Sequence, residues 1–253
     1  DRGGRLQVAY WALNNHIVQQ GFAYDSNAHA LTAATPSTQV DALGGANHPA
    51  LAISPVDDSL TVAWVSEAVS PARILARTWT STAGWGAVET VSTATVWTST
   101  NFGINIDQGP SLLIDGAGTR RLLYMETYDT TGDYGRVHSV TNTGAGWVDQ
   151  VLPVYTHDPA LAITGSGELY VLGHGHPLNA RLQSGLSTCL SMEDMCALRI
   201  GAGAWPTSRL IAPHSVTAGF DSSPSVKWSV VGFNRPEAVE FLFFATPYSA
   251  PIV

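Results

Sequence analysis

The hydrophobic positions along this 253-residue chain fall into short runs, which are separated by turns rich in glycine, proline, aspartate and serine. Within a run, apolar residues alternate with polar ones or are continuous over roughly four to eight positions, the pattern of β-strands. The spacing typical of amphipathic helices is nearly absent. The pattern therefore predicts an all-β protein.

One opening, in which a proline precedes a short apolar strand, recurs along the chain. Its copies are His48–Ile53, Gly109–Ile114, Asp158–Ile163 and Ser223–Trp228. A second strand is predicted after each opening, at Leu60–Val65, Arg121–Met125, Glu168–Leu172 and Ala238–Phe244. Third strands are predicted at Ile74–Trp79, Gly135–Val140 and Cys196–Ile200. A tryptophan (Trp85, Trp147 or Trp205) then introduces a fourth strand, at Ala87–Val91, Val148–Leu152 or Thr207–Ile211.

Four strands per unit at a period of about 50 residues is the signature of a β-propeller blade. We predict one β-propeller domain over residues 1–253, with four-stranded antiparallel blades at 47–107, 108–156 and 157–221 and incomplete terminal units at 1–46 and 222–253. The first unit, with strands at 5–11, 17–24 and 30–34, lacks an opening strand, and the last stops after its second strand. Four blades, five blades and an excerpt of a longer propeller are all compatible with this count.

Two expectations follow from the blade pattern. We interpret the tryptophan before each fourth strand as packing between neighbouring blades. Incomplete terminal units leave strand edges unpaired, so self-association through the terminal blades is a further expectation.

Composition narrows the class of protein. Charged residues make up only 13% of the chain, the formal net charge is −8, and no cluster of Lys and Arg occurs, which argues against nucleic acid as a partner. No run of eighteen or more apolar residues predicts membrane insertion. We predict a local disulfide between Cys189 and Cys196, which favours an oxidising compartment and hence a secreted or cell-surface protein. No metal or cofactor is expected.

The segment Pro110–Gly118, followed by Leu122–Tyr124 and Thr143–Trp147, resembles repeats of secreted bacterial β-propellers of the sialidase-like, BNR-type superfamily. That resemblance implies glycan binding or glycan processing, alongside adhesion and scaffolding. The superfamily's Asp box, Ser-x-Asp-x-Gly-x-Thr-Trp, does not occur in this sequence, and the sialidase arginine cluster and Tyr/Glu pair have no matching positions. Sialidase activity is therefore disfavoured.

In a propeller, the loops between strands two and three and the loops that enter strand one meet on one face around the central axis. The ligand-binding candidates in such loops are His48, Trp97, Asn101, Phe102, Asp107, Tyr128, Asp158, His176 and Tyr248. Histidine and tyrosine could act as base and acid next to a sugar carboxylate, with Arg73, Arg136 or Arg181 neutralising it. The candidates for catalysis are His157, His174, His176 and Tyr128. The alternative is that these polar residues cap strand ends and that the aromatic ones cover the rim.

Three functions fit these features. The preferred one is an extracellular, non-catalytic propeller that recognises glycans or a surface protein, because no catalytic motif occurs. The second is a polysaccharide lyase or glycoside hydrolase with a His/Tyr/Arg site on the central face. The third is a structural subunit of an extracellular assembly.

Overall fold

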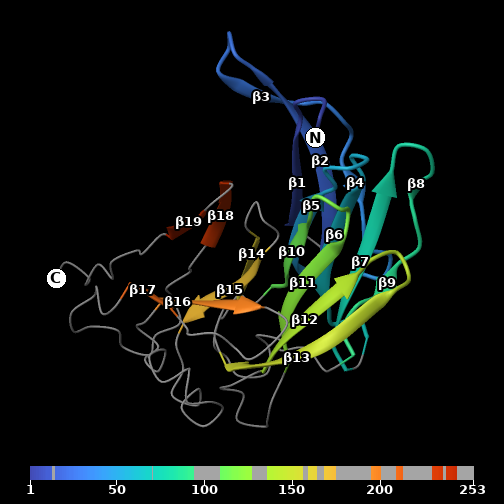
Figure 1. Cartoon of the computed structure of the whole chain (residues 1–253). Helices are drawn as coiled ribbons and strands as arrows, with labels where there is room; N and C mark the ends of the chain where they lie inside the picture. Colours follow the sequence, from blue (N-terminus) through green and yellow to red (C-terminus); the bar gives the residue numbers. More distant parts are fainter. Residues whose placement is uncertain are drawn as a thin grey trace, which may run out of the picture. The chain divides into compact units, whose positions relative to one another are not determined.

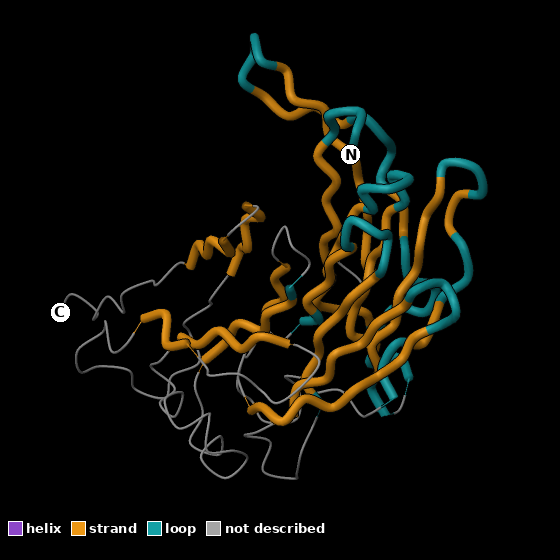
Figure 2. Tube along the Cα trace, viewed as in Figure 1, coloured by secondary structure: helices purple, strands orange, loops and turns teal. Residues whose placement is uncertain are grey.

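The computed structural model describes residues 1–12, 15–69, 71–93, 109–126, 136–155, 159–163, 168–174, 195–200, 209–212, 230–235 and 238–243. Every regular element within these ranges is a β-strand (Figures 1 and 2). The predicted all-β class is confirmed.

The strands form antiparallel sheets whose order follows the chain. The first sheet contains β1 (Leu6–Ala12), β2 (His16–Asp25), β3 (Ala30–Ala33) and β4 (Thr38–Gln39). The second contains β5 (Ala46–Ile53), β6 (Leu60–Ser66), β7 (Arg73–Thr80), β8 (Gly84–Trp85) and β9 (Glu89–Thr90). The third contains β10 (Ser111–Ile114), β11 (Arg120–Met125), β12 (Arg136–Asn142) and β13 (Trp147–Tyr155).

The fourth sheet contains β14 (Ala160–Ile163), β15 (Leu169–His174), β16 (Met195–Ile200) and β17 (Arg209–Ala212). The last strand pair is β18 (Val230–Arg235) with β19 (Ala238–Phe243). The predicted openings at 48–53, 109–114 and 158–163 correspond to β5, β10 and β14, and each pairs with its predicted second strand. The opening predicted at 223–228 lies outside the described residues, and the strand that pairs with β19 is β18.

Two compact units divide the chain. One comprises Asp1–Thr98, Gly109–Tyr124 and Ser139–Gln150, and the other comprises Ser99–Gln108, Met125–His138 and Val151–Val253. The first unit therefore holds the first two sheets and most of the third.

The second sheet is buried on both faces, as a propeller blade requires. All of β6 is buried, and its side chains alternate between two cores. Val62 and Trp64 face the first sheet, where they pack with Ile17 and Val40. The intervening residues Ala63 and Val65 face the third sheet, where they join a core with Leu122 and Tyr124. The first three sheets thus stack face to face (Figure 1).

The tryptophans before the fourth strands pack as predicted in this unit. Trp147 lies against the core between the second and third sheets, and its indole N–H donates a 2.7 Å hydrogen bond to Glu89 of the second sheet. Trp85 packs against the core between the first and second sheets. Trp205 lies outside the described residues.

The fourth strands of the first two sheets are interrupted, whereas the sequence predicted continuous ones. In the second sheet, β7 pairs first with β8 and then with β9, because the carbonyl of Gly86 between them accepts a 2.7 Å hydrogen bond from Arg77 Nε. In the first sheet, β2 pairs in the same way with β3 and then β4, and the Thr35 hydroxyl accepts from the Gly21 N–H at 2.8 Å. The shared interruption shows that the two sheets are copies of one repeat.

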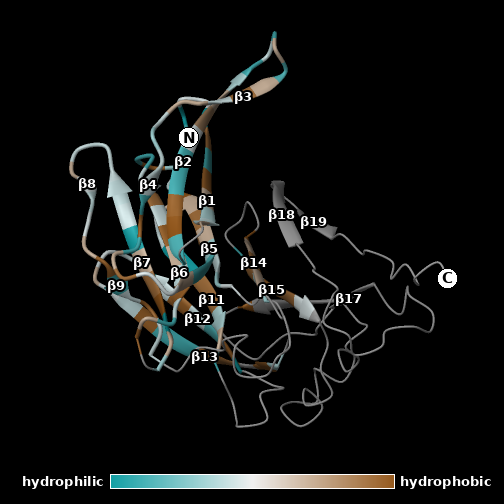
Figure 3. Ribbon diagram, turned by 180° about the vertical axis from the view of Figure 1, so that it is seen from behind, coloured by the Kyte–Doolittle hydropathy of each residue, from teal (hydrophilic) through white to brown (hydrophobic). Residues whose placement is uncertain are grey.

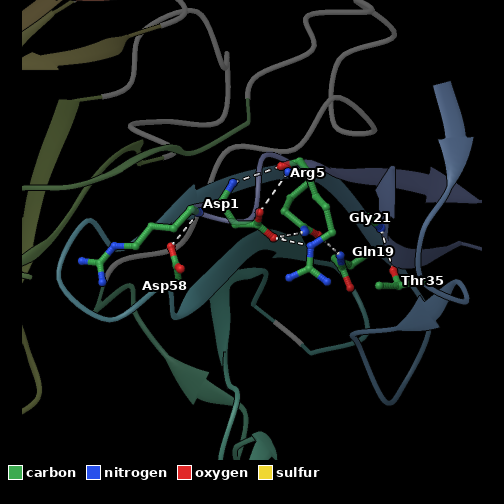
Figure 4. A network of polar contacts seen from close by, with 8 residues as sticks. Asp1, Arg5, Gln19, Gly21, Thr35 and Asp58 are labelled. Atoms are coloured by element: carbon green, nitrogen blue, oxygen red, sulfur yellow. Dashed lines mark hydrogen bonds and ion pairs between the residues drawn. The ribbon is translucent and has the colours of Figure 1, made fainter. Parts of the chain in front are cut away.

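A polar network ties the first residues of the chain to the first sheet (Figure 4). The Asp1 carboxylate accepts hydrogen bonds from Arg5 Nε at 2.8 Å and from Gln7 Nε2 at 2.9 Å. Gln7 Oε1 in turn accepts from Gln19 Nε2 of β2 at 2.6 Å. The backbone N–H of Arg2 donates to Asp58 in the turn between β5 and β6, so this segment joins the first two sheets.

Candidate functional site

The first residues of β5 form a bulge at the end of the second sheet. Its register with β6 shifts between Asn47 and Ala50, and His48 within the bulge has a φ of 48°. Pro49 has no N–H to donate to the ladder, which suits an irregular strand start. The predicted ligand residue His48 therefore stands at a strained strand entrance, where functional side chains are commonly held.

The entrance to β10 packs directly against this bulge. A Cβ atom on Gly109 would lie 3.0 Å from His48 Cβ and 3.1 Å from the His48 carbonyl oxygen, so a larger residue would fit only if His48 shifted. β5 and β10 are also in contact along the sheet edge. Two proline-led opening strands thus lie side by side, as the repeat pattern predicts.

Loops from the first two sheets meet at the same end. The Asn15 carbonyl, in the loop between β1 and β2, accepts a 3.0 Å hydrogen bond from the Ala46 N–H. The Gly45 carbonyl, in the loop that enters β5, accepts one of 2.8 Å from the Glu67 N–H, in the loop between β6 and β7. We call this surface, formed by residues 11–12, 15–16, 41–48, 66–69, 71–73 and 109–110, the loop face.

His16 and Asp41 form an oriented pair on the loop face. The Asp41 carboxylate is buried, and its Oδ2 lies 2.8 Å from His16 Nδ1 and accepts from the Gly44 N–H at 3.0 Å. Its Oδ1 accepts from the Ile17 N–H at 2.6 Å. The His16 side chain is 30% exposed, so a ligand can reach an imidazole whose orientation the carboxylate fixes.

Trp11 supplies an exposed apolar side chain at the same end of the first sheet. It pairs with Ile17, and the next pair joins Ala12 to His16, so Trp11 and His16 project from opposite faces at this end. The Trp11 side chain is 59% exposed although tryptophan is usually largely buried. An exposed indole is suited to stacking on a sugar ring.

Two buried polar atoms near the loop face have no hydrogen-bond partner. They are Nη1 of Arg73, the first residue of β7, and Oδ1 of Asn47 in the bulge of β5. Arg73 occupies the same position in its strand as His16 does in β2, because Arg73 pairs with Ser66 and His16 with Ala12 at the loop end of each sheet. Unpaired buried polar groups are costly, and at a binding site they are the groups that a ligand or water satisfies.

In the second unit, Glu126, Arg136 and His138 form a cluster in which Glu126 and His138 are buried. Glu126 Oε1 accepts from Arg136 Nε at 3.0 Å and from Arg136 Nη2 at 2.6 Å, and Glu126 Oε2 contacts His138 Nε2. His138 is 3% exposed, so its ring is sealed from any ligand in this arrangement. The cluster joins the facing ends of β11 and β12, and its geometry supports a structural role.

The structure places only part of the predicted site. Among the predicted ligand residues, His48 is described and lies on the loop face. His174 ends β15, and Arg73 and Arg136 begin β7 and β12. Ten predicted site residues lie outside the described ranges: Trp97, Asn101, Phe102, Asp107, Tyr128, His157, Asp158, His176, Arg181 and Tyr248.

Sequence reasoning missed three residues of the loop face, namely Trp11, His16 and Asp41. The signal for them was available, since Trp11 and His16 flank a short loop between two predicted strands of the first unit. They were passed over because that unit lacks its opening strand. Cys189 also lies outside the described residues, and its pairing with Cys196 stays a prediction.

Among the described residues no helix is long and apolar enough to span a membrane. Within the same ranges, no group of three or more His, Cys, Asp or Glu side chains is placed to hold a metal ion.

No protein-family model matches the sequence, and no curated protein does. Among solved structures, the chain is similar to a fungal lectin from Aleuria aurantia, described as a six-bladed β-propeller with a novel fucose recognition mode. Identity is 13% and the TM-score is 0.51, over 96% of this chain and 67% of the lectin. An ulvan lyase is 10% identical with a TM-score of 0.49, over 97% of this chain and 64% of the lyase. A Hadza microbial sialidase is 7% identical with a TM-score of 0.44, over 78% of this chain and 44% of the sialidase.

At such low identity, the likeness to the lectin shows the fold alone. The chain has a β-propeller fold of antiparallel sheets, as the repeat pattern predicted.

Proposed function

We propose that this chain is an extracellular, non-catalytic β-propeller that binds glycans on the loop face. One observation carries the proposal: an exposed indole, Trp11, stands at the same sheet end as a carboxylate-oriented imidazole, His16. Protein sites for sugars combine such an apolar platform for a ring face with fixed groups that bond hydroxyls. Asn47 and Arg73 add an acceptor and a donor that lack protein partners.

The geometry favours binding over turnover. Cleavage of a glycan needs an acid and a base that reach the substrate. Glu126 and His138 are buried, so they do not reach it. The exposed loop-face groups are suited to hydrogen bonding with sugar hydroxyls. A location outside the cell is part of the proposal, supported by the low charge content and the cysteine pair.

A glycan array, followed by calorimetry on the glycans that bind, tests this function. We expect Trp11→Ala to weaken binding about tenfold or more, the effect of losing ~1.4 kcal/mol of stacking. Tyr24→Ala is the matched control, because Tyr24 is also 59% exposed but lies away from the loop face. The proposal is contradicted if the two substitutions weaken glycan binding equally or if neither substitution changes it.

The runner-up function is a polysaccharide lyase or glycoside hydrolase. The His16–Asp41 pair favours it, since a carboxylate that orients an accessible imidazole is a common general-base arrangement. The binding and enzyme hypotheses are separated by prolonged incubation with each polysaccharide that binds. The mixture is assayed for new reducing ends and for the absorbance of unsaturated uronates. We expect no product. Product formation that His16→Gln abolishes would establish the enzyme instead.

A further inference from the structure

The third strand of the repeat begins with a basic residue in each of the first three sheets. These residues are His16 of β2, Arg73 of β7 and Arg136 of β12. His16 and Arg73 are equivalent, because the residues that follow them, Ile17 and Ile74, each donate a backbone N–H to a side chain just after the fourth strand. The repeat therefore places a basic side chain at one fixed position on the loop face.

Arg136 occupies the same position as Arg73. β6 and β11 begin at equivalent residues, since the first residue of each pairs with the last residue of its proline-led opening strand. Ser66 and Glu126 each stand six residues after that start. Ser66 pairs with Arg73, and the Glu126 N–H donates to the Arg136 carbonyl at 2.9 Å. Ser66 is thus equivalent to Glu126, and Arg73 to Arg136.

Carboxylates of the chain itself bind two of these three basic side chains. In the first sheet, Asp41 Oδ2 lies 2.8 Å from His16 Nδ1. In the third sheet, Glu126 Oε1 accepts from Arg136 Nε at 3.0 Å and from Arg136 Nη2 at 2.6 Å. Asp41 follows β4 and Glu126 follows β11, so the repeat has two places from which a carboxylate can reach this position.

The second sheet has a serine at both of these places. Ser92 stands where the first sheet has Asp41, and Ser66 stands where the third sheet has Glu126. Both serines are buried. Arg73 takes part in none of the ion pairs within the described residues, and its buried Nη1 has no hydrogen-bond partner. Since a guanidinium is always charged, the second sheet holds a cation without the carboxylate that the other two copies supply.

Arg73 projects to the same side of its sheet as the core that the first two sheets share. Trp64 packs in that core, and Ser66 lies two residues further along the same strand. Because side chains alternate along a strand and paired residues share a face, Ser66 and its partner Arg73 project to the side of Trp64. Trp11 pairs with Ile17, which packs in the same core. Figure 3 shows the hydrophobic stretches of β1 and β2. The exposed indole and the unpaired guanidinium thus belong to the loop end of one contact between two sheets.

We propose that Arg73 binds the carboxylate of an acidic sugar, so that the glycans recognised at the loop face carry carboxylates. The inference rests on the proposed function and names its class of glycan. A planar carboxylate accepts two N–H bonds from one guanidinium, as Glu126 does from Arg136. In a chain with a formal net charge of −8, an uncompensated cation is also what an anionic ligand needs to overcome repulsion by the protein.

Uronic-acid oligosaccharides on a glycan array, each beside its methyl ester, test the proposal. Calorimetry then measures the affinities of every pair in which one member binds. We expect the wild-type protein to bind the free acid about tenfold or more tightly than the ester, because the ester keeps the sugar but loses the charge. In Arg73→Gln the acid and the ester should bind about equally, at the level of the ester in the wild type.

Two further variants separate the charge of Arg73 from its side-chain volume. Ser66→Glu places a carboxylate where the third sheet has Glu126, so it should remove the preference for the acid although Arg73 is kept. Arg2→Gln is the matched control. It removes one guanidinium at the opposite end of the second sheet, where Arg2 donates to the Val56 carbonyl at 2.8 Å, and it should keep the preference. Thermal unfolding of each variant checks that it is folded.

Three results would overturn this inference while leaving glycan binding intact. The acid and the ester could bind the wild type equally, Arg73→Gln could weaken both by the same factor, or Arg2→Gln could remove the preference as fully as Arg73→Gln does. Binding of sulfated sugars in place of carboxylated ones would likewise contradict the carboxylate. If no glycan binds at all, the proposed function fails and this inference fails with it.

Discussion

The turn between β10 and β11 shows how single residues set the local structure. Asp115 Oδ1 accepts from the N–H groups of Ala117 and Thr119 at 3.0 and 2.9 Å, and its Oδ2 accepts from Arg121 Nε at 2.9 Å. Burial by itself raises the pKa of Asp115, but the Thr119 N–H and Arg121 outweigh it, and the pKa lies below its ordinary value of 3.8. Gly118, at a φ of 81°, completes the turn at low conformational cost.

This turn predicts acid sensitivity. Since the folded-state pKa of Asp115 is lowered, its contribution to stability is fully present above pH 3.8 and is lost as the pH falls through the folded-state pKa. We expect Asp115→Asn to cost about 1–2 kcal/mol at neutral pH and less in acid. Denaturant unfolding of both proteins across this pH range measures the difference, and a penalty that is the same at every pH would contradict it.

Equivalent residues also close the third strand in two sheets. The Ile17 N–H donates to Asp41 Oδ1 at 2.6 Å, and the Ile74 N–H donates to Ser92 Oγ at 2.9 Å. Aspartate and serine satisfy the same backbone group, but only the carboxylate can also orient His16. Both copies of the repeat thus keep a side chain that accepts from the backbone N–H of the third strand. In the first sheet, that side chain also orients the His16 imidazole.

At the scale of elements, the second and third sheets are joined by a polar clamp around Glu89. Its two carboxylate oxygens accept from Arg120 Nη1 at 3.1 Å and from Trp147 Nε1 at 2.7 Å. The Arg120 guanidinium also lies 4.9 Å from the centre of the Trp147 ring. These contacts fix how one blade lies on the next.

Removing the clamp should loosen the contact between these sheets. We expect Glu89→Ala to lower the free energy of unfolding by about 1–2 kcal/mol, because Arg120 and Trp147 each lose a charge-assisted hydrogen bond. Glu67→Ala is the control, since Glu67 is exposed. Chemical unfolding measures both changes, and a Glu89→Ala protein as stable as the Glu67→Ala protein would contradict this account.

The elements could largely be predicted from sequence, because period-two alternation and proline-led openings are local signals. β5, β10 and β14 begin close to the predicted prolines. The interrupted fourth strands could not be predicted, since the Arg77–Gly86 and Thr35–Gly21 hydrogen bonds that take the place of ladder bonds depend on register. β18 was not predicted, and the opening strand predicted at 223–228 lies outside the described residues.

At the scale of the whole molecule, one repeat serves two purposes. Stacked copies bury both faces of the second sheet, and the loop ends of the first two copies bring Trp11, His16 and His48 to the loop face. The sequence predicted the propeller fold and named His48 as a ligand residue. It did not identify His16 and Asp41 as a pair, because they are 25 positions apart and only the fold brings them together.

The most direct test of glycan binding at the loop face is an NMR titration with a glycan selected on the array. The indole N–H signal of Trp11, assigned by its loss in Trp11→Ala, should shift progressively as the glycan is added, together with the amide signals of His16 and His48. The amide signal of Tyr24, near the opposite end of β2 from His16, should stay in place. Saturable binding that leaves the Trp11 signal unmoved and shifts residues elsewhere would contradict the account.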